Sequence, residues 1–142
     1  MRVAFGTDES TPLTAAIVAA LEGMGHDVVV AADGIDWPDA GRRVGQAVAA
    51  GEADAGVVCC WTGTGVSMAA NKVPGVRAAL CTDAETARGA RRWNDANVLA
   101  LSLRLTSPPV AAEMLEAFLT TGVDEGEQRL IQRVEPDSLG AQ

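Results

Sequence analysis

Short apolar runs alternate with helix-like segments along the whole chain, and this alternation limits the possible folds more than any other feature. The apolar runs predict strands at residues 3–5, 27–31, 55–60, 76–81 and 97–102. The intervening segments carry apolar residues at the spacing of helices, at 10–24, 38–50, 65–72, 83–92 and from 108 onward. Because the predicted strands are continuously apolar, they are typical of a parallel sheet that helices cover on both faces.

The same alternation predicts one doubly wound α/β domain over residues 1–142, without an internal linker or repeat. A chain of this length can bury a single good core. The segment at 122–142 is polar and charged. We expect it to form a C-terminal tail that is available for packing on a partner subunit.

Net charge and cysteine usage argue against several classes of function. The net charge of −8 disfavours a nucleic-acid partner and an anionic membrane surface. No apolar stretch reaches the roughly 18 residues of a membrane span, and the first residues do not resemble a secretory leader, so we expect a cytoplasmic protein. Three cysteines, two of them adjacent, and a single histidine argue against a disulfide framework and a zinc site. We therefore expect no metal.

One loop lies where an open parallel sheet binds its ligands, beyond the carboxyl ends of the strands. It belongs to the stretch CCWTGTGVSMAANK at 59–72, which begins at the end of the strand predicted at 55–60. A nucleotide cradle is disfavoured, because a dinucleotide fingerprint would need a glycine or alanine where Met68 stands. A redox site is disfavoured as well, because no CxxC spacing is present.

Proton abstraction is the third interpretation of this loop. Cys60 ends its strand and faces the loop, whereas alternation along the strand turns Cys59 toward the core. An enediolate intermediate needs a base beside the carbon and hydrogen-bond donors beside the carbonyl oxygen. Cys60 and the backbone N–H groups of 61–65 can supply both, and the N-terminus of the following helix favours a negative charge on the thiol.

Three segments of the chain resemble the type B ribose-5-phosphate isomerases and the galactose-6-phosphate isomerase subunits. They are FGTDE at 5–9, CWTGTGVSMAANKVPGVRAALC at 60–81 and RWNDANVLA at 92–100, and the resemblance runs from residue 1 to 134. It implies a Rossmann-like α/β/α sandwich without a metal or cofactor, which works as a dimer or tetramer. It also implies an aldose–ketose isomerase for a small sugar or sugar phosphate, with Cys60 as the base of a cis-enediolate mechanism.

The resemblance also implies roles for residues other than the cysteine. Thr62 and the loop amides would hold substrate oxygens, Asp8 and Asn94 would bind sugar hydroxyls, and arginines would hold the phosphate. The predicted catalytic residues are Cys60, Thr62 and Glu9, and the predicted substrate-binding residues are Asp8, Glu9, Trp61, Gly63, Thr64, Gly65, Trp93, Asn94, Arg104, Arg129 and Arg133.

Three positions depart from the family pattern. Glu9 stands where the family has a substrate-binding histidine, Trp93 where it has the histidine that opens the sugar ring, and Trp61 where it has a glycine. Ring opening must then come from Glu9 or another group, or the substrate is already acyclic. The alternatives are a catalytically weak sugar-binding or regulatory homologue, and an epimerase or lyase that uses the same base. Simpler roles also remain open: Asp8 as a helix cap, the two tryptophans as packing residues and Arg104 as a surface charge.

Strand direction predicts that the site is shared between two chains. Cys60 follows the carboxyl end of one strand, whereas Trp93 and Asn94 precede the amino end of another. A strand of about five residues is roughly 17 Å long. The side chains of Trp93 and Asn94 are too short to cover that distance to the Cys60 of their own chain. A two-fold dimer brings the two ends together twice over, so we expect a homodimer or tetramer with composite sites. The arginines of the tail would arrive by the same route.

Overall fold

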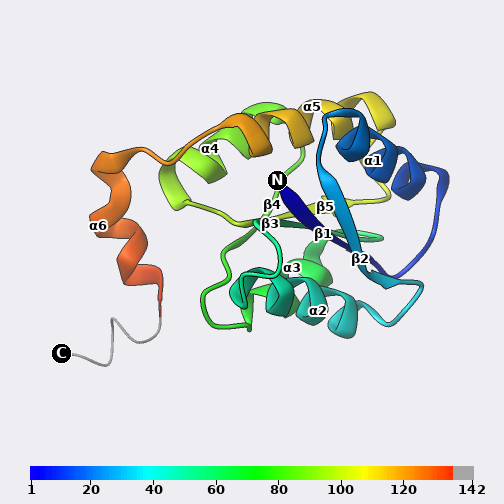
Figure 1. Cartoon of the computed structure of the whole chain (residues 1–142), viewed down its shortest axis with the longest axis horizontal. Helices are drawn as coiled ribbons and strands as arrows, with labels where there is room; N and C mark the ends of the chain where they lie inside the picture. The colour runs from blue at the N-terminus through cyan, green and yellow to red at the C-terminus, as the bar shows by residue number, and fades with distance from the viewer. Residues whose placement is uncertain (136–142) are drawn as a thin grey trace.

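A parallel sheet of five strands between two layers of helices forms the centre of the computed structural model, which describes residues 1–135 (Figure 1). The strand order is β2-β1-β3-β5-β4. Helices α1, α4 and α5 cover one face of the sheet, and α2 and α3 cover the other. These observations confirm the predicted α/β sandwich. The elements are β1 (Arg2–Thr7), α1 (Pro12–Gly23), β2 (Asp27–Asp33), α2 (Trp37–Ala49), β3 (Ala55–Cys60), α3 (Thr64–Asn71), β4 (Ala78–Leu80), α4 (Ala84–Asn94), β5 (Val98–Ser102) and α5 (Pro108–Thr120).

Local sequence signals set the helix boundaries. Thr11 caps α1, because its side chain accepts a hydrogen bond from the Thr14 amide while the Thr14 hydroxyl accepts one from the Thr11 amide. Ser107 caps α5 by accepting a hydrogen bond from the amide of Val110. Gly25, with φ of 87°, turns the chain after α1 in the left-handed region that a side chain would disfavour.

Two apolar layers, one on each face of the sheet, form the core. The first layer lies under α1, α4 and α5, and its largest buried members are Ile17, Leu21, Leu99, Leu101, Met114, Leu115 and Phe118. The second layer lies under α2 and α3 and includes Val44, Val58, Val66 and Val98. Because consecutive residues of a strand face opposite sides, Cys59 belongs to the first layer and Cys60 to the second.

The two edge strands differ from the predicted pattern. Val29 and Val30 of β2 are 41% and 55% exposed, because β2 has a neighbouring strand on one side only. β4 is shorter than the predicted strand at 76–81. The Asn71 side chain stands where a further strand would pair with it: its Nδ2 donates to the Ala78 carbonyl at 2.9 Å, and its Oδ1 accepts from the Ala78 amide at 2.7 Å. The free edge of β4 is therefore closed at Ala78.

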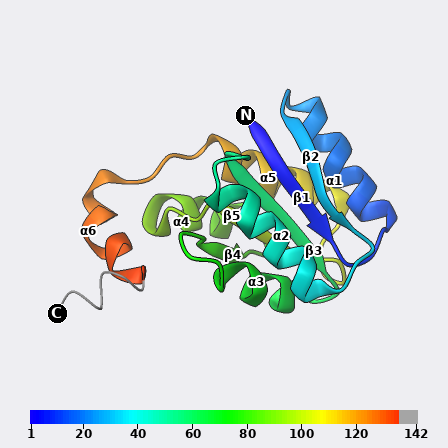
Figure 2. The same cartoon turned by 60° about the horizontal axis from the view of Figure 1, so that its bottom comes forward.

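Residues 122–135 form a C-terminal arm that projects from the sandwich beside the end of α4 (Figure 2). The arm contains the short turns η1 (Glu125–Glu127), α6 (Gln128–Ile131) and η2 (Gln132–Val134), which the sequence pattern did not predict. The remainder of the predicted tail, 136–142, lies outside the described residues. None of the helices within residues 1–135 combines the length and the apolar character that a membrane span requires.

Candidate active site

The loop between β3 and α3 turns at a glycine with a left-handed backbone conformation. Gly63 precedes the first residue of α3 and has φ of 78°. A Cβ atom at this position would lie 2.9 Å from the carbonyl carbon of Leu101, so conformation and space both require glycine. The first amides of a helix have no partner within the helix, so those of Thr64, Gly65 and Val66 are donors at the end of β3. Beside them, the hydroxyls of Thr62 and Thr64 are hydrogen-bonded at 2.7 Å.

Hydrogen bonds from the end of β5 hold this loop in place. The amide of Leu103 donates to the carbonyl of Cys60, and the amide of Arg104 donates to the carbonyl of Trp61, both at 3.0 Å. Ser102 is 2% exposed, and its hydroxyl donates to the same Trp61 carbonyl at 3.0 Å and accepts from the Leu105 amide at 3.2 Å. Sequence reasoning missed Ser102, although a polar residue that ends an apolar strand was a signal for it.

The loop after β1 brings an acidic pair to the same edge of the sheet. The buried hydroxyl of Thr7 donates to the Glu9 carbonyl at 2.8 Å and accepts from the Glu9 amide at 3.3 Å, which sets the turn. The Asp8 amide donates to the carbonyl of Cys59 at 3.4 Å, so Asp8 lies beside the end of β3. Asp8 does not cap α1, since Thr11 does.

One carboxylate oxygen of Asp8 is buried without a protein partner. Oδ1 of Asp8 is inaccessible to solvent and makes no hydrogen bond with any residue in the described part of the chain. Burial raises the pKa of the Asp8 carboxyl above its ordinary value, and the neighbouring charge of Glu9 raises it further. A buried acceptor of this kind is suited to a donor from a ligand, such as a hydroxyl group.

The adjacent cysteines face different surroundings. Cys59 is fully buried in the first core layer, and this burial raises the pKa of its thiol far above the ordinary value. Cys60 is 6% exposed and belongs to the second layer, together with Val66 of α3. Cys60 therefore lies on the face of the sheet where α3 begins. Burial raises the pKa of the third thiol, Cys81, to about 11.

Aromatic and charged residues surround the loop. Trp37, which sequence reasoning did not identify, packs against it: a Cβ atom on Gly65 would lie 2.8 Å from Cε3 of Trp37. Trp61 is 59% exposed, and Arg104 is exposed as well. We refer to the loops beyond the carboxyl ends of the strands as the carboxyl edge. It holds nine of the predicted site residues: Asp8, Glu9, Cys60, Trp61, Thr62, Gly63, Thr64, Gly65 and Arg104.

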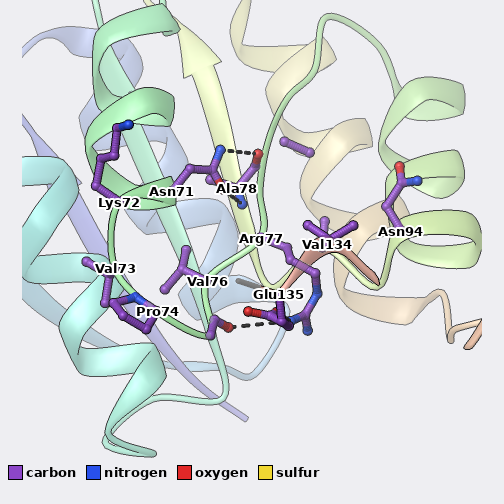
Figure 3. Close-up of a pocket in the computed structure, with 13 residues that line it drawn as sticks. Asn71, Lys72, Val73, Pro74, Val76, Arg77, Ala78, Asn94, Val134 and Glu135 are labelled. Atoms are coloured by element: carbon purple, nitrogen blue, oxygen red, sulfur yellow. Dashed lines mark hydrogen bonds and ion pairs between the residues drawn. The ribbon is translucent and has the colours of Figure 1, made fainter. Parts of the chain in front are cut away.

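Trp93, Asn94, Arg129 and Arg133 lie at the opposite end of the strands, which we call the amino end. Trp93 and Asn94 close α4 before β5 begins, and the two arginines are exposed on the arm. The ring of Trp93 lies back along α4 against Gly89 and lines a pocket with Leu80 and Cys81, beside β4. Asn94 borders a pocket of about 490 Å³ that Arg77, Val134 and Glu135 also line (Figure 3). Strand direction thus separates Asn94 and the two arginines of one chain from its own Cys60.

The residues within 1–135 include no group of three or more His, Cys, Asp or Glu side chains placed to hold a metal ion.

Comparison with known proteins identifies the family. Residues 3–136 match the sequence profile of the family described as Ribose/Galactose Isomerase. Ribose-5-phosphate isomerase B of Escherichia coli is 37% identical over 139 residues, which cover 94% of this chain and 92% of that protein. D-erythrulose-4-phosphate isomerase of Pectobacterium atrosepticum is 38% identical over 90 residues, which cover 63% of this chain and 59% of that protein.

A solved structure gives the same result for the fold. Ribose-5-phosphate isomerase B of Clostridium thermocellum superimposes with a TM-score of 0.90 and 33% identity, and the match covers 100% of both chains. Sequence profile, sequence identity and fold agree over nearly the whole described chain. The protein therefore belongs to the Ribose/Galactose Isomerase family.

Proposed function

We propose that the protein is an aldose–ketose isomerase that acts on a small sugar phosphate. The observation that carries the proposal is the position of Cys60. Its thiol lies on the face of β3 where α3 begins, beside the loop that carries the buried, unpartnered oxygen of Asp8. The E. coli relative, which is named a ribose-5-phosphate isomerase and aligns with most of the chain, supports the same class of reaction.

The proposed reaction moves one proton between two neighbouring carbons. The Cys60 thiolate removes the proton from C2 of the aldose, and the electrons of the C–H bond form the C1–C2 double bond of a cis-enediolate. The first amides of α3 stabilise the negative oxygen, as preorganised donors do in other sites of this kind. Thr62, hydrogen-bonded to Thr64, carries the proton between the two oxygens, and Cys60 returns its proton to C1. Atoms and charge balance without a co-reactant.

Asp8 binds a sugar hydroxyl in this scheme. A hydroxyl is a donor that can satisfy the buried Oδ1, and the carboxylate form of Asp8 is stabilised when it accepts such a hydrogen bond. Glu9, which is exposed at the mouth of the site, is the group at the carboxyl edge that would open the ring of a cyclic substrate. The single histidine, His26, precedes β2 and lies near the amino group of Met1 at 3.3 Å, away from Cys60.

The absence of a histidine at the carboxyl edge favours a substrate with an open chain. A four-carbon sugar phosphorylated on its terminal oxygen cannot close a five-membered ring, because the ring would need that oxygen. Such a tetrose or tetrulose phosphate presents its carbonyl group directly. A four-carbon substrate is also shorter than a pentose, so it leaves space in the site for Trp61, which is much larger than the glycine at this position in the family pattern. The name of the Pectobacterium relative, D-erythrulose-4-phosphate isomerase, agrees with this substrate class.

A second copy of the chain completes the proposed site. The loops of the carboxyl edge contain one cation, Arg104, and four carboxylates, Asp8, Glu9, Asp36 and Asp83. This negative balance is a poor match for a phosphate. Trp93, Asn94, Arg129 and Arg133 are exposed at the amino end, and Trp93 is 56% exposed. In a two-fold dimer these residues face the Cys60 of the partner and supply two further arginines. A homodimer or tetramer is therefore part of the proposal, and a cytoplasmic location stays a prediction.

Proton exchange in D2O tests the chemistry. The protein is incubated with erythrose 4-phosphate, ribose 5-phosphate and the unphosphorylated sugars, and NMR follows the signal of the proton at C2. We expect deuterium at C2 and the matching ketose, faster for the four-carbon phosphate. Cys60→Ala should abolish exchange, while Cys59→Ala, its matched control, should retain it. Exchange that persists in Cys60→Ala would refute the proposed base.

The same experiment separates the other functions that the missing family histidines favour. Binding without exchange would indicate a sugar-binding or regulatory homologue. Exchange without a ketose product would indicate an epimerase or lyase that uses the same base.

A further inference from the structure

Four charged residues at the amino end form a partly buried chain of ion pairs. Arg91 Nη1 contacts Asp95 Oδ1 at 2.9 Å, Asp95 Oδ2 contacts Arg77 Nη2 at 3.3 Å, and Arg77 Nη1 contacts Glu135 Oε1 at 2.6 Å. The side chains of Arg77 and Arg91 are only 19% and 21% exposed. In the other ion pairs of the described chain, Arg2–Asp27, Arg42–Asp39 and Arg88–Glu85, every partner is at least 41% exposed.

This chain of ion pairs fixes the turn that follows Asn94. Asp95 ends α4 with φ of 46°, in the left-handed region that residues other than glycine adopt uncommonly, although aspartate tolerates it better than most. Arg77 Nε donates to the carbonyl of Asp95 at 2.8 Å, while its guanidinium binds the Asp95 carboxylate. Arg91 donates to the carbonyl of Ala96 at 2.6 Å. Two arginines thus hold both the backbone and the side chain of the residue next to Asn94.

Arg91 and Arg77 also bind the two ends of the C-terminal arm. At its near end, the Asp124 amide donates to the Arg92 carbonyl at 2.8 Å, and Arg91 donates to the Thr121 carbonyl at 3.1 Å. At its far end, Glu135 binds Arg77. Arg129 and Arg133 lie between these two attachments and are exposed. Figure 3 shows Arg77 and Glu135 next to Val134, with Asn94 on the neighbouring helix.

We propose that Arg77 is a positioning residue for catalysis in the partner subunit. It holds Asn94 and the far end of the arm in one rigid unit, and this unit is what a chain presents to the Cys60 of its neighbour. Arg77 contacts no substrate in this arrangement, and its own chain's Cys60 does not depend on it. The inference rests on the shared site proposed above, and it assigns the task of assembling the donated half to a residue outside that site.

Lysine cannot replace arginine in this role. The guanidinium group reaches the Asp95 carbonyl, the Asp95 carboxylate and Glu135 through three different nitrogens. The single ammonium group of a lysine is a point charge without this planar fork. Arg77→Lys should therefore keep the charge of the amino end and lose most of its geometry.

Mixed dimers test the inference, because they have one working site, to which one chain gives Cys60 and the other gives the amino end. Arg77→Ala can then be placed in either chain alone. One chain carries Cys60→Ala and keeps an intact amino end, and the other carries Asn94→Ala and keeps an intact Cys60. We expect each chain to be inactive alone, and co-expression with two different affinity tags isolates the mixed dimer. Its one working site combines Cys60 of the second chain with the amino end of the first.

Arg77→Ala is then added to either chain. In the Cys60→Ala chain, which donates the amino end, it should raise KM and lower kcat/KM at least 10-fold. In the Asn94→Ala chain it should change kcat/KM by less than 2-fold. Arg77→Lys in the donating chain should recover only part of the loss. Glu135→Gln, which removes one ion pair and leaves the Arg77–Asp95 pair intact, should give a smaller loss with the same dependence on the chain. Thermal melting of each mixed dimer checks that folding is intact.

The two possible failures are distinct. If the mixed dimer with intact Arg77 regains no activity, the shared site is wrong, and the inference is overturned with it. If that dimer is active but Arg77→Ala and Glu135→Gln have equal effects in either chain, Arg77 acts only on stability, and the inference alone is overturned.

Discussion

The carboxyl edge and the amino end are built by different interactions. At the carboxyl edge, backbone amides, backbone carbonyls and the buried hydroxyls of Thr7 and Ser102 hold the loops around Cys60. At the amino end, long charged side chains connect α4, the start of β4 and the arm. The reacting atom proposed at Cys60 would have to be held to a fraction of an ångström, and backbone hydrogen bonds are suited to this. In the dimer proposed above, the amino end must reach outward to a second chain, and long side chains suit that task.

Glycine shows the same contrast. Gly63 at the carboxyl edge and Gly75 at the amino end both have positive φ, 78° and 85°. A Cβ atom on Gly63 would lie 2.9 Å from the backbone of Leu101, whereas a Cβ atom on Gly75 would have no atom within 4 Å. The carboxyl edge is therefore packed against its surroundings, and the amino end keeps open space around the same backbone conformation.

The largest effect is expected from alanine at these two glycines. Gly63→Ala should lower the free energy of unfolding by about 3 kcal/mol or more and remove activity, because backbone strain and a clash with a strand add together. Gly75→Ala, the matched control, should cost only about 1 kcal/mol from strain. Urea unfolding measures both. Equal losses would show that the two regions are packed alike.

The next largest effect is expected at Ser102. Ser102→Ala leaves the Trp61 carbonyl and the Leu105 amide without one partner each, so it should cost about 1–3 kcal/mol and lower kcat as the loop loosens. Ser107→Ala removes the cap of α5 and should cost about 1 kcal/mol without lowering kcat. A kcat that falls equally in both variants would contradict a specific role for Ser102 in the loop.

A smaller effect is expected at the edge of the sheet near the amino end. Asn71→Ala removes both hydrogen bonds to Ala78 and should cost about 1 kcal/mol, with a greater tendency to self-associate through the opened edge of β4. Asn71→Asp should behave no better, because its carboxylate accepts from the Ala78 amide but repels the Ala78 carbonyl. Melting curves and light scattering follow the two effects, and unchanged values in both would show that the edge needs no such closure.

The smallest effect is a dependence of stability on pH. The pKa of Asp8 is raised above 3.8 in the folded protein, mainly by burial, so the folded state holds this proton more tightly than the unfolded state. Stability due to Asp8 therefore falls as pH rises from 3.8 through the raised pKa. Asp8→Asn should be more stable than the original protein at neutral pH and lose this advantage in acid, while binding substrate less tightly. An advantage that stays constant between pH 3 and pH 7 would contradict the raised pKa.

The fold was predictable because its signals are local. Apolar periodicity and capping residues such as Thr11 and Ser107 lie within a few residues of the element that they define. The prediction was weakest where neighbours decide the outcome. The length of β4 depends on its place at the edge of the sheet, and the turns of the arm, of three or four residues each, are too short for a helical period to stand out.

The candidate site was predictable only in part, for the same reason. Alternation along β3 was enough to separate Cys59 from Cys60, because strand geometry is local. Ser102 was missed because its partner, the Trp61 carbonyl, is 41 residues away in the sequence. Trp37 was missed because only the packing of α2 against α3 brings it to Gly65. The ion pairs of Arg77 likewise depend on three segments that meet only in the folded chain.

The placement of the tryptophans gives the protein its own optical probes. The chain has three tryptophans and no tyrosine, so these residues dominate its ultraviolet fluorescence. Trp37 and Trp61, 45% and 59% exposed, report on the carboxyl edge, and Trp93, 56% exposed, reports on the half of the molecule around α4 and β4. Variants that keep one tryptophan each would therefore emit from one half of the molecule at a time. A ligand that touches a single chain would change the emission of one half, whereas a ligand held between two chains would change both together.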